Sequence, residues 1–171
     1  MTQIVVLTIF PLLLIYAAIG DVRAMRIPNW LNGLMAAAFF PVAFLAGMPL
    51  AEMGWHLAAF GVVLLAGMAL FTFGFIGGGD AKMLAAAALW VGWGDALMMF
   101  VIITAVGGGL LAIVMKLWQL ASLEQGVWGR DGALRKALSR NLELPYGVAI
   151  AAGALLAYPS AASWWSAVIS G

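Results

Sequence analysis

The sequence has no cysteine and a single histidine, His56, among its 171 residues. Without cysteine there can be no disulfide framework, thiolate nucleophile or cysteine-ligated zinc. Zinc peptidases need two or three imidazoles or a histidine-rich motif at fixed spacing, so one histidine argues against metal catalysis. We therefore expect no metal. We also expect no other cofactor and no nucleic-acid partner.

Charged residues are also scarce, at 9% of the chain, whereas 65% of the residues are hydrophobic. So few charges cannot cover a water-soluble surface, and apolar runs of about 17 to 25 residues are the usual unit of a bilayer span. The chain contains six such runs, which predict an all-α membrane bundle that fills residues 1–171 as one domain. We expect the first run to be a retained span rather than a signal peptide. The runs cover residues 4–20, 31–48, 54–76, 81–93, 96–117 and 145–165.

The charges are distributed unevenly between the connections. If the six spans alternate in direction, all eight basic residues fall on one side, and only Glu52 and Asp95 fall on the other. The positive-inside rule makes the basic side cytoplasmic, so both termini are predicted to face outward. Seven tryptophans near the ends of the runs are typical of an interfacial aromatic belt, namely Trp30, Trp55, Trp90, Trp93, Trp118, Trp164 and Trp165.

The only extended polar stretch is the connection 119–144. Within it Leu134, Leu138 and Leu142 recur every four residues, which predicts a short amphipathic helix. Such a helix can lie on the anionic cytoplasmic leaflet, or it can simply connect two spans as a solvated loop helix.

Two aspartates stand at the predicted cytoplasmic face. Asp21 follows the first span, and Asp80 follows Gly77, Gly78 and Gly79 where the fourth span begins. If these two spans are neighbours, the carboxyls can converge and share one proton, so that one acts as general base toward water while the other polarises a peptide carbonyl. The alternative is structural, because an aspartate after a glycine turn is a good helix N-cap, and Asp21 can belong to an ordinary juxtamembrane turn.

Three segments resemble the type IV prepilin peptidases, which are membrane aspartyl proteases. Residues 77–82 (GGGDAK) look like the family's Gly-x-Gly-Asp-x-Lys motif. Asp21 with residues 27–29 (IPN) is similar to the first catalytic aspartate and its downstream Ile-Pro-Asn. Residues 144–147 (LPYG) and 149–153 (AIAAG) resemble the start of the last helix. The matches follow the family's order over most of the chain.

The resemblance implies that Asp21 and Asp80 are catalytic and that the substrate is a prepilin with one hydrophobic helix, cut at the cytoplasmic face of the inner membrane. Supporting roles around the two acids are expected for Gly77, Gly79, Lys82, Pro28 and Asn29. Longer members also carry a cysteine-containing module and N-methylate the pilin. Because this chain has no cysteine, we expect peptidase activity without methyltransferase activity, as in the short forms that serve Flp-type, tight-adherence pili.

Other functions remain open at this level. Interfacial acids also occur in proton- or cation-coupled transporters, although here no acid lies in the middle of a span. A non-catalytic scaffold that recruits partners through its cytoplasmic helix is a further alternative. Lys82, Arg23 and Arg26 can either favour ionised carboxylates or bind an acidic part of a substrate. A rhomboid-like serine protease fits poorly, because no serine has the required context and His56 belongs to the opposite face.

Overall fold

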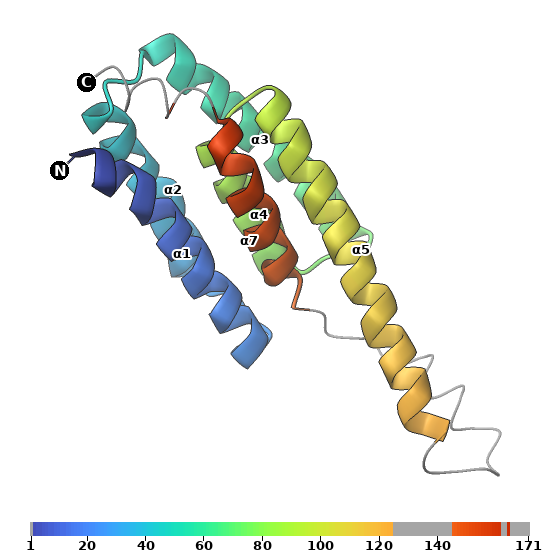
Figure 1. Ribbon diagram of the computed structural model, residues 1–171. Helices are drawn as coiled ribbons and strands as arrows, with labels where there is room; N and C mark the ends of the chain where they lie inside the picture. The colour runs from blue at the N-terminus through green and yellow to red at the C-terminus, as the bar shows by residue number, and fades with distance from the viewer. Residues whose placement is uncertain (1, 125–144, 162–163, 165–171) are drawn as a thin grey trace.

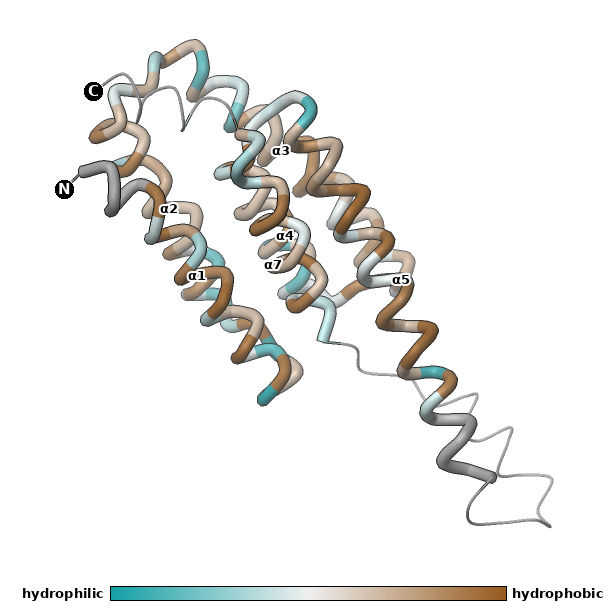
Figure 2. The backbone as a smooth tube through the Cα atoms, viewed as in Figure 1, coloured by the Kyte–Doolittle hydropathy of each residue, from teal (hydrophilic) through white to brown (hydrophobic). Residues whose placement is uncertain are grey.

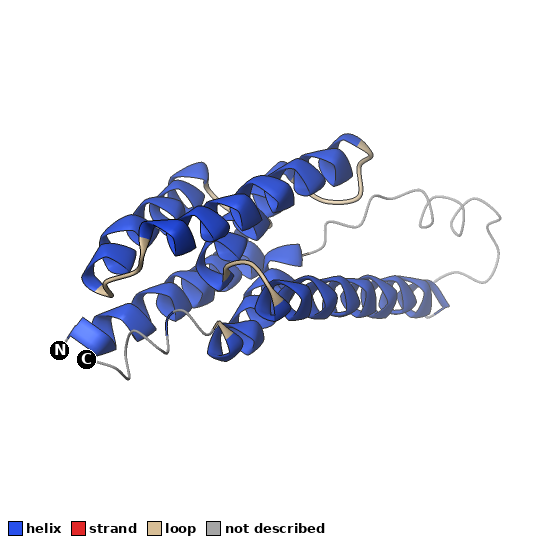
Figure 3. Cartoon of the chain, turned by 90° about the horizontal axis from the view of Figure 1, so that it is seen from above, coloured by secondary structure: helices blue, strands red, loops and turns tan. Residues whose placement is uncertain are grey.

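The structure is a computed structural model that describes residues 2–124, 145–161 and 164. Within these residues the chain forms only helices and short connections, which confirms the all-α prediction (Figures 1 and 3). The elements are α1 (Thr2–Ala24), α2 (Asn29–Leu45), α3 (Leu50–Thr72), α4 (Gly78–Val91), α5 (Asp95–Glu124), α7 (Tyr146–Ala157) and the 3-10 helix η1 (Tyr158–Ser160).

The first helix is longer than the apolar run that predicts it. It continues past Gly20 to Ala24 and stops at Met25, which has a positive φ of 50°. Asp21 therefore lies on the last turn of α1 and not in the connection after it, which corrects our prediction. A glycine weakens a helix but does not end it when tertiary contacts support the following turn. Pro28 then occupies the N-cap of α2, where its missing N–H costs nothing.

Helix α4 forms the centre of the bundle. It packs against α2, α3 and α7, while α7 also lies between α1 and α5 (Figure 1). Four consecutive alanines, Ala85 to Ala88, are fully or almost fully buried on α4. Their small side chains let neighbouring helices approach closely, as is usual where helices associate in membranes.

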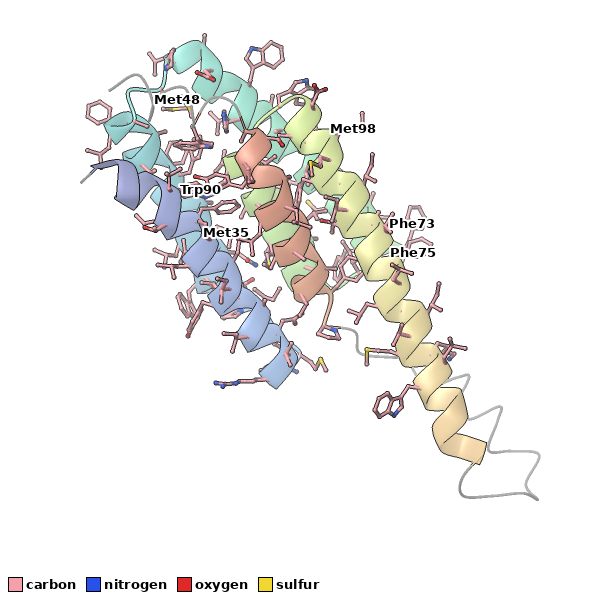
Figure 4. All side chains as sticks on the ribbon, viewed as in Figure 1. Met35, Met48, Phe73, Phe75, Trp90 and Met98 are labelled. Carbon is pink, nitrogen blue, oxygen red and sulfur yellow. The ribbon has the colours of Figure 1, made fainter. Side chains whose placement is uncertain are left out.

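Two of the predicted interfacial tryptophans lie in the core instead. Trp90 and Trp164 have no exposed surface, and their rings stack with centroids 5.5 Å apart. The indole N–H of Trp90 donates to the carbonyl of Met35 at 2.8 Å, and that of Trp164 donates to the carbonyl of Trp90 at 2.6 Å. Figure 4 shows Trp90 and Met35 inside the bundle. Indoles can be buried because a carbonyl satisfies each N–H, so these two residues are not lipid-interface anchors.

The outer surface of the bundle is strongly apolar, as a lipid environment requires. Figure 2 shows hydrophobic residues along the helix shafts and hydrophilic residues gathered mainly near the helix ends. Among the described residues, three segments are long and apolar enough to cross a membrane: Leu7–Ala24, Leu50–Thr72 and Asp95–Trp118. Helices α2, α4 and α7 are shorter, with 17, 14 and 12 residues. The count of six spans and their orientation stay predictions.

The structure describes only the first residues of the predicted polar connection 119–144. Helix α5 runs on through Glu124, so the first residues of the predicted 119–144 segment continue this helix. The expected amphipathic helix with Leu134, Leu138 and Leu142 lies outside the described residues.

Candidate active site

Asp21 is held by a backbone amide from the far end of the chain. Its side chain is only 3% exposed, and its Oδ2 accepts a hydrogen bond of 2.7 Å from the N–H of Gly147. Gly147 stands in the first turn of α7, where N–H groups have no partner within the helix and the helix dipole is positive. A Cβ on Gly147 would lie 2.8 Å from Asp21 Oδ2, so only glycine allows this approach.

Asp80 lies in the first turn of α4, three residues after its N-cap. The N-cap is Gly77, whose N–H donates to Asp80 Oδ2 over 3.2 Å. Asp80 is thus not the N-cap that the structural alternative supposes, but it does satisfy an amide at the start of its own helix. A Cβ on Gly77 would lie 2.8 Å from the same carboxylate oxygen. The glycine at this position therefore gives the side chain of Asp80 room to fold back.

Two polar contacts join the chain that follows Asp21 to the chain around Asp80. Lys82 Nζ donates to Asn29 Oδ1 at 2.8 Å, and Asn32 Nδ2 donates to the carbonyl of Gly79 at 3.0 Å. Gly79 also packs so closely that a Cβ there would lie 3.2 Å from the carbonyl oxygen of Ile27. The predicted support residues Asn29, Lys82 and Gly79 therefore take part in one junction between the α1–α2 connection and α4.

Both aspartates line a single cavity of about 800 Å³. Its wall combines the last turns of α1, residues 27–29 at the start of α2, and residues 77–80 at the start of α4. Pro28, Gly77 and Gly79 lie in this wall as well, so the cavity gathers most of the residues that the sequence motifs single out. Arg23 and Arg26 line it with exposed side chains and form no ion pair with the described residues.

The charge of Asp21 affects the protonation of Asp80. Burial and, after it, the nearby Asp21 carboxylate raise the pKa of Asp80 to about 6, against a smaller opposing effect of the Gly77 N–H. A carboxyl with a pKa near neutrality can hold a proton for part of the time and give it up readily. The arrangement can therefore carry one proton on a pair of acids, which is the requirement for general acid–base chemistry by two carboxyls.

No metal site accompanies the two acids in the part of the chain that the structure describes. There, no group of three or more histidine, aspartate or glutamate side chains comes together as a metal ion would require. His56 lies in α3 at the other end of the bundle, 2% exposed, and its Nδ1 bonds to the carbonyl of Leu89 at 2.6 Å. It lines a separate cavity of about 410 Å³ with Glu52 and Asp95, away from Asp21 and Asp80.

Sequence reasoning missed two contributors to this junction. Asn32 had a visible signal, because it is a polar residue inside the apolar run 31–48, and polar groups at such positions usually have a function. Gly147 stood in a recognised motif, but its partner could not be foreseen, since the hydrogen bond to Asp21 joins residues 126 positions apart.

Comparison with known proteins gives a consistent family. The sequence pattern described as the type IV leader peptidase family matches residues 8–113. The chain is also 30% identical over 156 residues to the prepilin leader peptidase/N-methyltransferase of Bacillus subtilis (strain 168). That alignment covers 88% of this chain but 53% of the relative, so the chain spans about half the relative's length. No solved structure matches significantly.

Proposed function

Because this chain belongs to the type IV leader peptidase family, we propose that it is a membrane aspartyl endopeptidase that removes the leader peptide from prepilins. In this proposal Asp21 and Asp80 are the catalytic pair, and no cofactor takes part. The cut is made at the cytoplasmic face of the inner membrane, for a pilus or pseudopilus system. Methyltransferase activity is not part of the proposal. The longer members that also N-methylate the pilin carry a cysteine-containing module, and this chain contains no cysteine.

The observation that carries the proposal is the shared cavity. Asp21 and Asp80 are 59 positions apart in sequence, yet both line the same opening, and the charge of one affects the protonation of the other. Structural capping alone explains why each accepts an amide hydrogen bond. It does not explain why the two acids share a cavity or why a like charge is tolerated next to a half-buried carboxyl, since that repulsion costs stability.

The reaction uses the single proton that the pair shares. The ionised carboxylate takes a proton from a water molecule, whose oxygen attacks the scissile carbonyl carbon while the protonated carboxyl donates a hydrogen bond and then its proton to the carbonyl oxygen. A tetrahedral intermediate results. As it collapses the C–N bond breaks, the leaving amine takes a proton from the first acid, and the second acid recovers its own. The pair ends in its initial state.

The substrate we propose has one hydrophobic helix and a polar leader. A transmembrane helix of this kind can slide in the bilayer against the apolar surface of the bundle and present its leader junction at the cavity. Arg23 and Arg26 are available on the cavity wall for an acidic part of the substrate. Lys82 is already engaged with Asn29, so its role is in holding α4 against α2.

The placement of charges supports a cytoplasmic site. Arg23, Arg26 and Lys82 are near the catalytic cavity, whereas Glu52 and Asp95 line the cavity at the opposite end. This is the segregation expected from the positive-inside rule. Helices α1 and α3 end near the catalytic cavity, and α2, α4 and α7 begin there (Figure 1). Successive helices therefore alternate in direction, as the proposed six spans require, although α4 and α7 are short.

Leader removal from a prepilin tests the proposal directly. Membranes containing the wild-type protein should shorten a Flp-type prepilin, and Asp21→Asn or Asp80→Asn should abolish this cleavage while the protein stays inserted. Asp95→Asn is the matched control, because Asp95 is also an interfacial acid but lies at the opposite end of the bundle. Unchanged cleavage by Asp80→Asn would refute the aspartyl mechanism, and a scaffold would keep its function in both variants.

The family match does not favour a transporter.

A further inference from the structure

Asn32 is a buried polar residue in an otherwise apolar helix. It lies in the first turns of α2, its side chain is 5% exposed, and its neighbours Leu31 and Met35 belong to the hydrophobic core. Burying an amide costs free energy unless its donors and acceptors are satisfied. A leucine of similar size would pack here without that cost, so the amide calls for an explanation other than packing.

The contacts of the amide fix its orientation. Nδ2 donates to the carbonyl of Gly79 at 3.0 Å, and a flipped amide would place two oxygens against each other. The other amide atom, Oδ1, accepts no hydrogen bond from the described residues. An unsatisfied buried acceptor is itself unfavourable. The amide is thus retained for the sake of one bond, the bond to Gly79.

That bond acts next to a catalytic acid, because Gly79 directly precedes Asp80. On the assumption that the proposed function is correct, we infer that Asn32 is a positioning residue, which fixes the Gly79–Asp80 peptide and thereby the direction of the Asp80 carboxyl toward Asp21. Gly79 is held from its other side by close packing on Ile27, where even a Cβ would approach the carbonyl oxygen to 3.2 Å. The peptide is clamped between these two contacts.

The inference predicts a defect in the chemical step and not in substrate binding. Asn32→Leu removes both the donor and the unsatisfied acceptor, so the fold should tolerate it, but the first turn of α4 loses the hydrogen bond to its Gly79 carbonyl. Misplacing a catalytic group by about 1 Å can cost on the order of 100-fold in rate. We expect kcat for leader removal to fall about 10- to 100-fold in purified full-length protein, with KM for the prepilin within about twofold of wild type.

Asn32→Asp gives a second and distinct signature. Its side chain has the same shape, and it can donate to the Gly79 carbonyl only when it is protonated. Because this position is buried, it favours the uncharged form of the carboxyl, so the variant should come closest to wild-type kcat at the acid end of the pH range and lose activity more steeply than wild type as the pH rises. The result remains informative even if Asn32→Leu fails to fold.

Thr104→Val is the matched control, because Thr104 on α5 is also buried and its Oγ1 also lacks a hydrogen-bond partner among the described residues. It should keep the wild-type kcat. Wild-type kcat in Asn32→Leu, or a pH profile of Asn32→Asp that matches wild type, would overturn the role of Asn32 and leave the peptidase proposal intact. Failure of the wild-type protein to cut the prepilin would overturn both.

Discussion

If Asp21 and Asp80 share one proton as proposed, cleavage must depend on pH. Burial and the neighbouring Asp21 charge place the pKa of Asp80 at about 6. Just below this pH Asp80 keeps the proton that the proposed mechanism needs. Above it Asp80 ionises, both acids carry a negative charge, and no carboxyl remains to polarise the scissile carbonyl. Activity should therefore decrease as the pH rises through 6.

The size of the effect follows from the fraction of Asp80 that remains protonated. With a pKa of about 6 this fraction is about one-tenth at pH 7 and about one-hundredth at pH 8. The rate constant for leader removal should accordingly fall about tenfold per pH unit on this limb. The measurement is kcat/KM of the detergent-solubilised enzyme on a purified prepilin between pH 5 and 8, with thermal unfolding recorded at each pH to show that the fold persists.

An infrared titration separates the two causes of the raised pKa. In Asp21→Asn the neighbouring charge is gone but burial remains, so the carboxylic acid band of Asp80 should disappear at a lower pH than in wild type. A rate that stays constant or rises between pH 6 and 8 would refute the shared-proton reasoning. An Asp80 titration that Asp21→Asn leaves unchanged would show that the two acids are not coupled.

Two further substitutions test the contacts around the site and in the core. Gly147→Ala should reduce cleavage about 10- to 100-fold, because the added Cβ would lie 2.8 Å from Asp21 Oδ2 and displace it; Gly109→Ala, where a Cβ meets nothing within 4 Å, should cut like wild type in the same assay. Trp90→Phe removes a buried hydrogen bond and should lower the free energy of unfolding by about 1–3 kcal/mol in a denaturant titration. The exposed Trp93→Phe should change it little, and equal losses in both variants would contradict the burial of Trp90.

The sequence was sufficient for the helical class and the family, because long apolar runs and a motif with fixed spacing are local properties. It was less informative about which surface of a helix meets lipid. Lipid tails and protein interiors are similarly apolar, so hydropathy cannot separate an exposed tryptophan such as Trp93 from a buried one such as Trp90. Only the carbonyl that receives the indole N–H distinguishes them, and that partner is 55 residues away.

The same limit applies at the site. The motifs pointed to Asp21 and Asp80 as a pair, but they could not show what holds each carboxyl. Asn32 and Gly147 act through contacts between segments that are far apart in sequence, and such contacts leave no periodic pattern. The sequence also placed Asp21 beyond the first helix, because Gly20 was read as its end, whereas packing carries α1 for another turn.

The bond between Gly147 and Asp21 has a consequence for when the protein can act. During synthesis both acids leave the ribosome long before α7, so an unfinished chain holds the reactive groups without the amide that orients one of them. We expect the proposed proteolytic activity to arise only after α7 has docked. If the proposed function is correct, the peptidase is inactive while its own hydrophobic segments are still entering the bilayer.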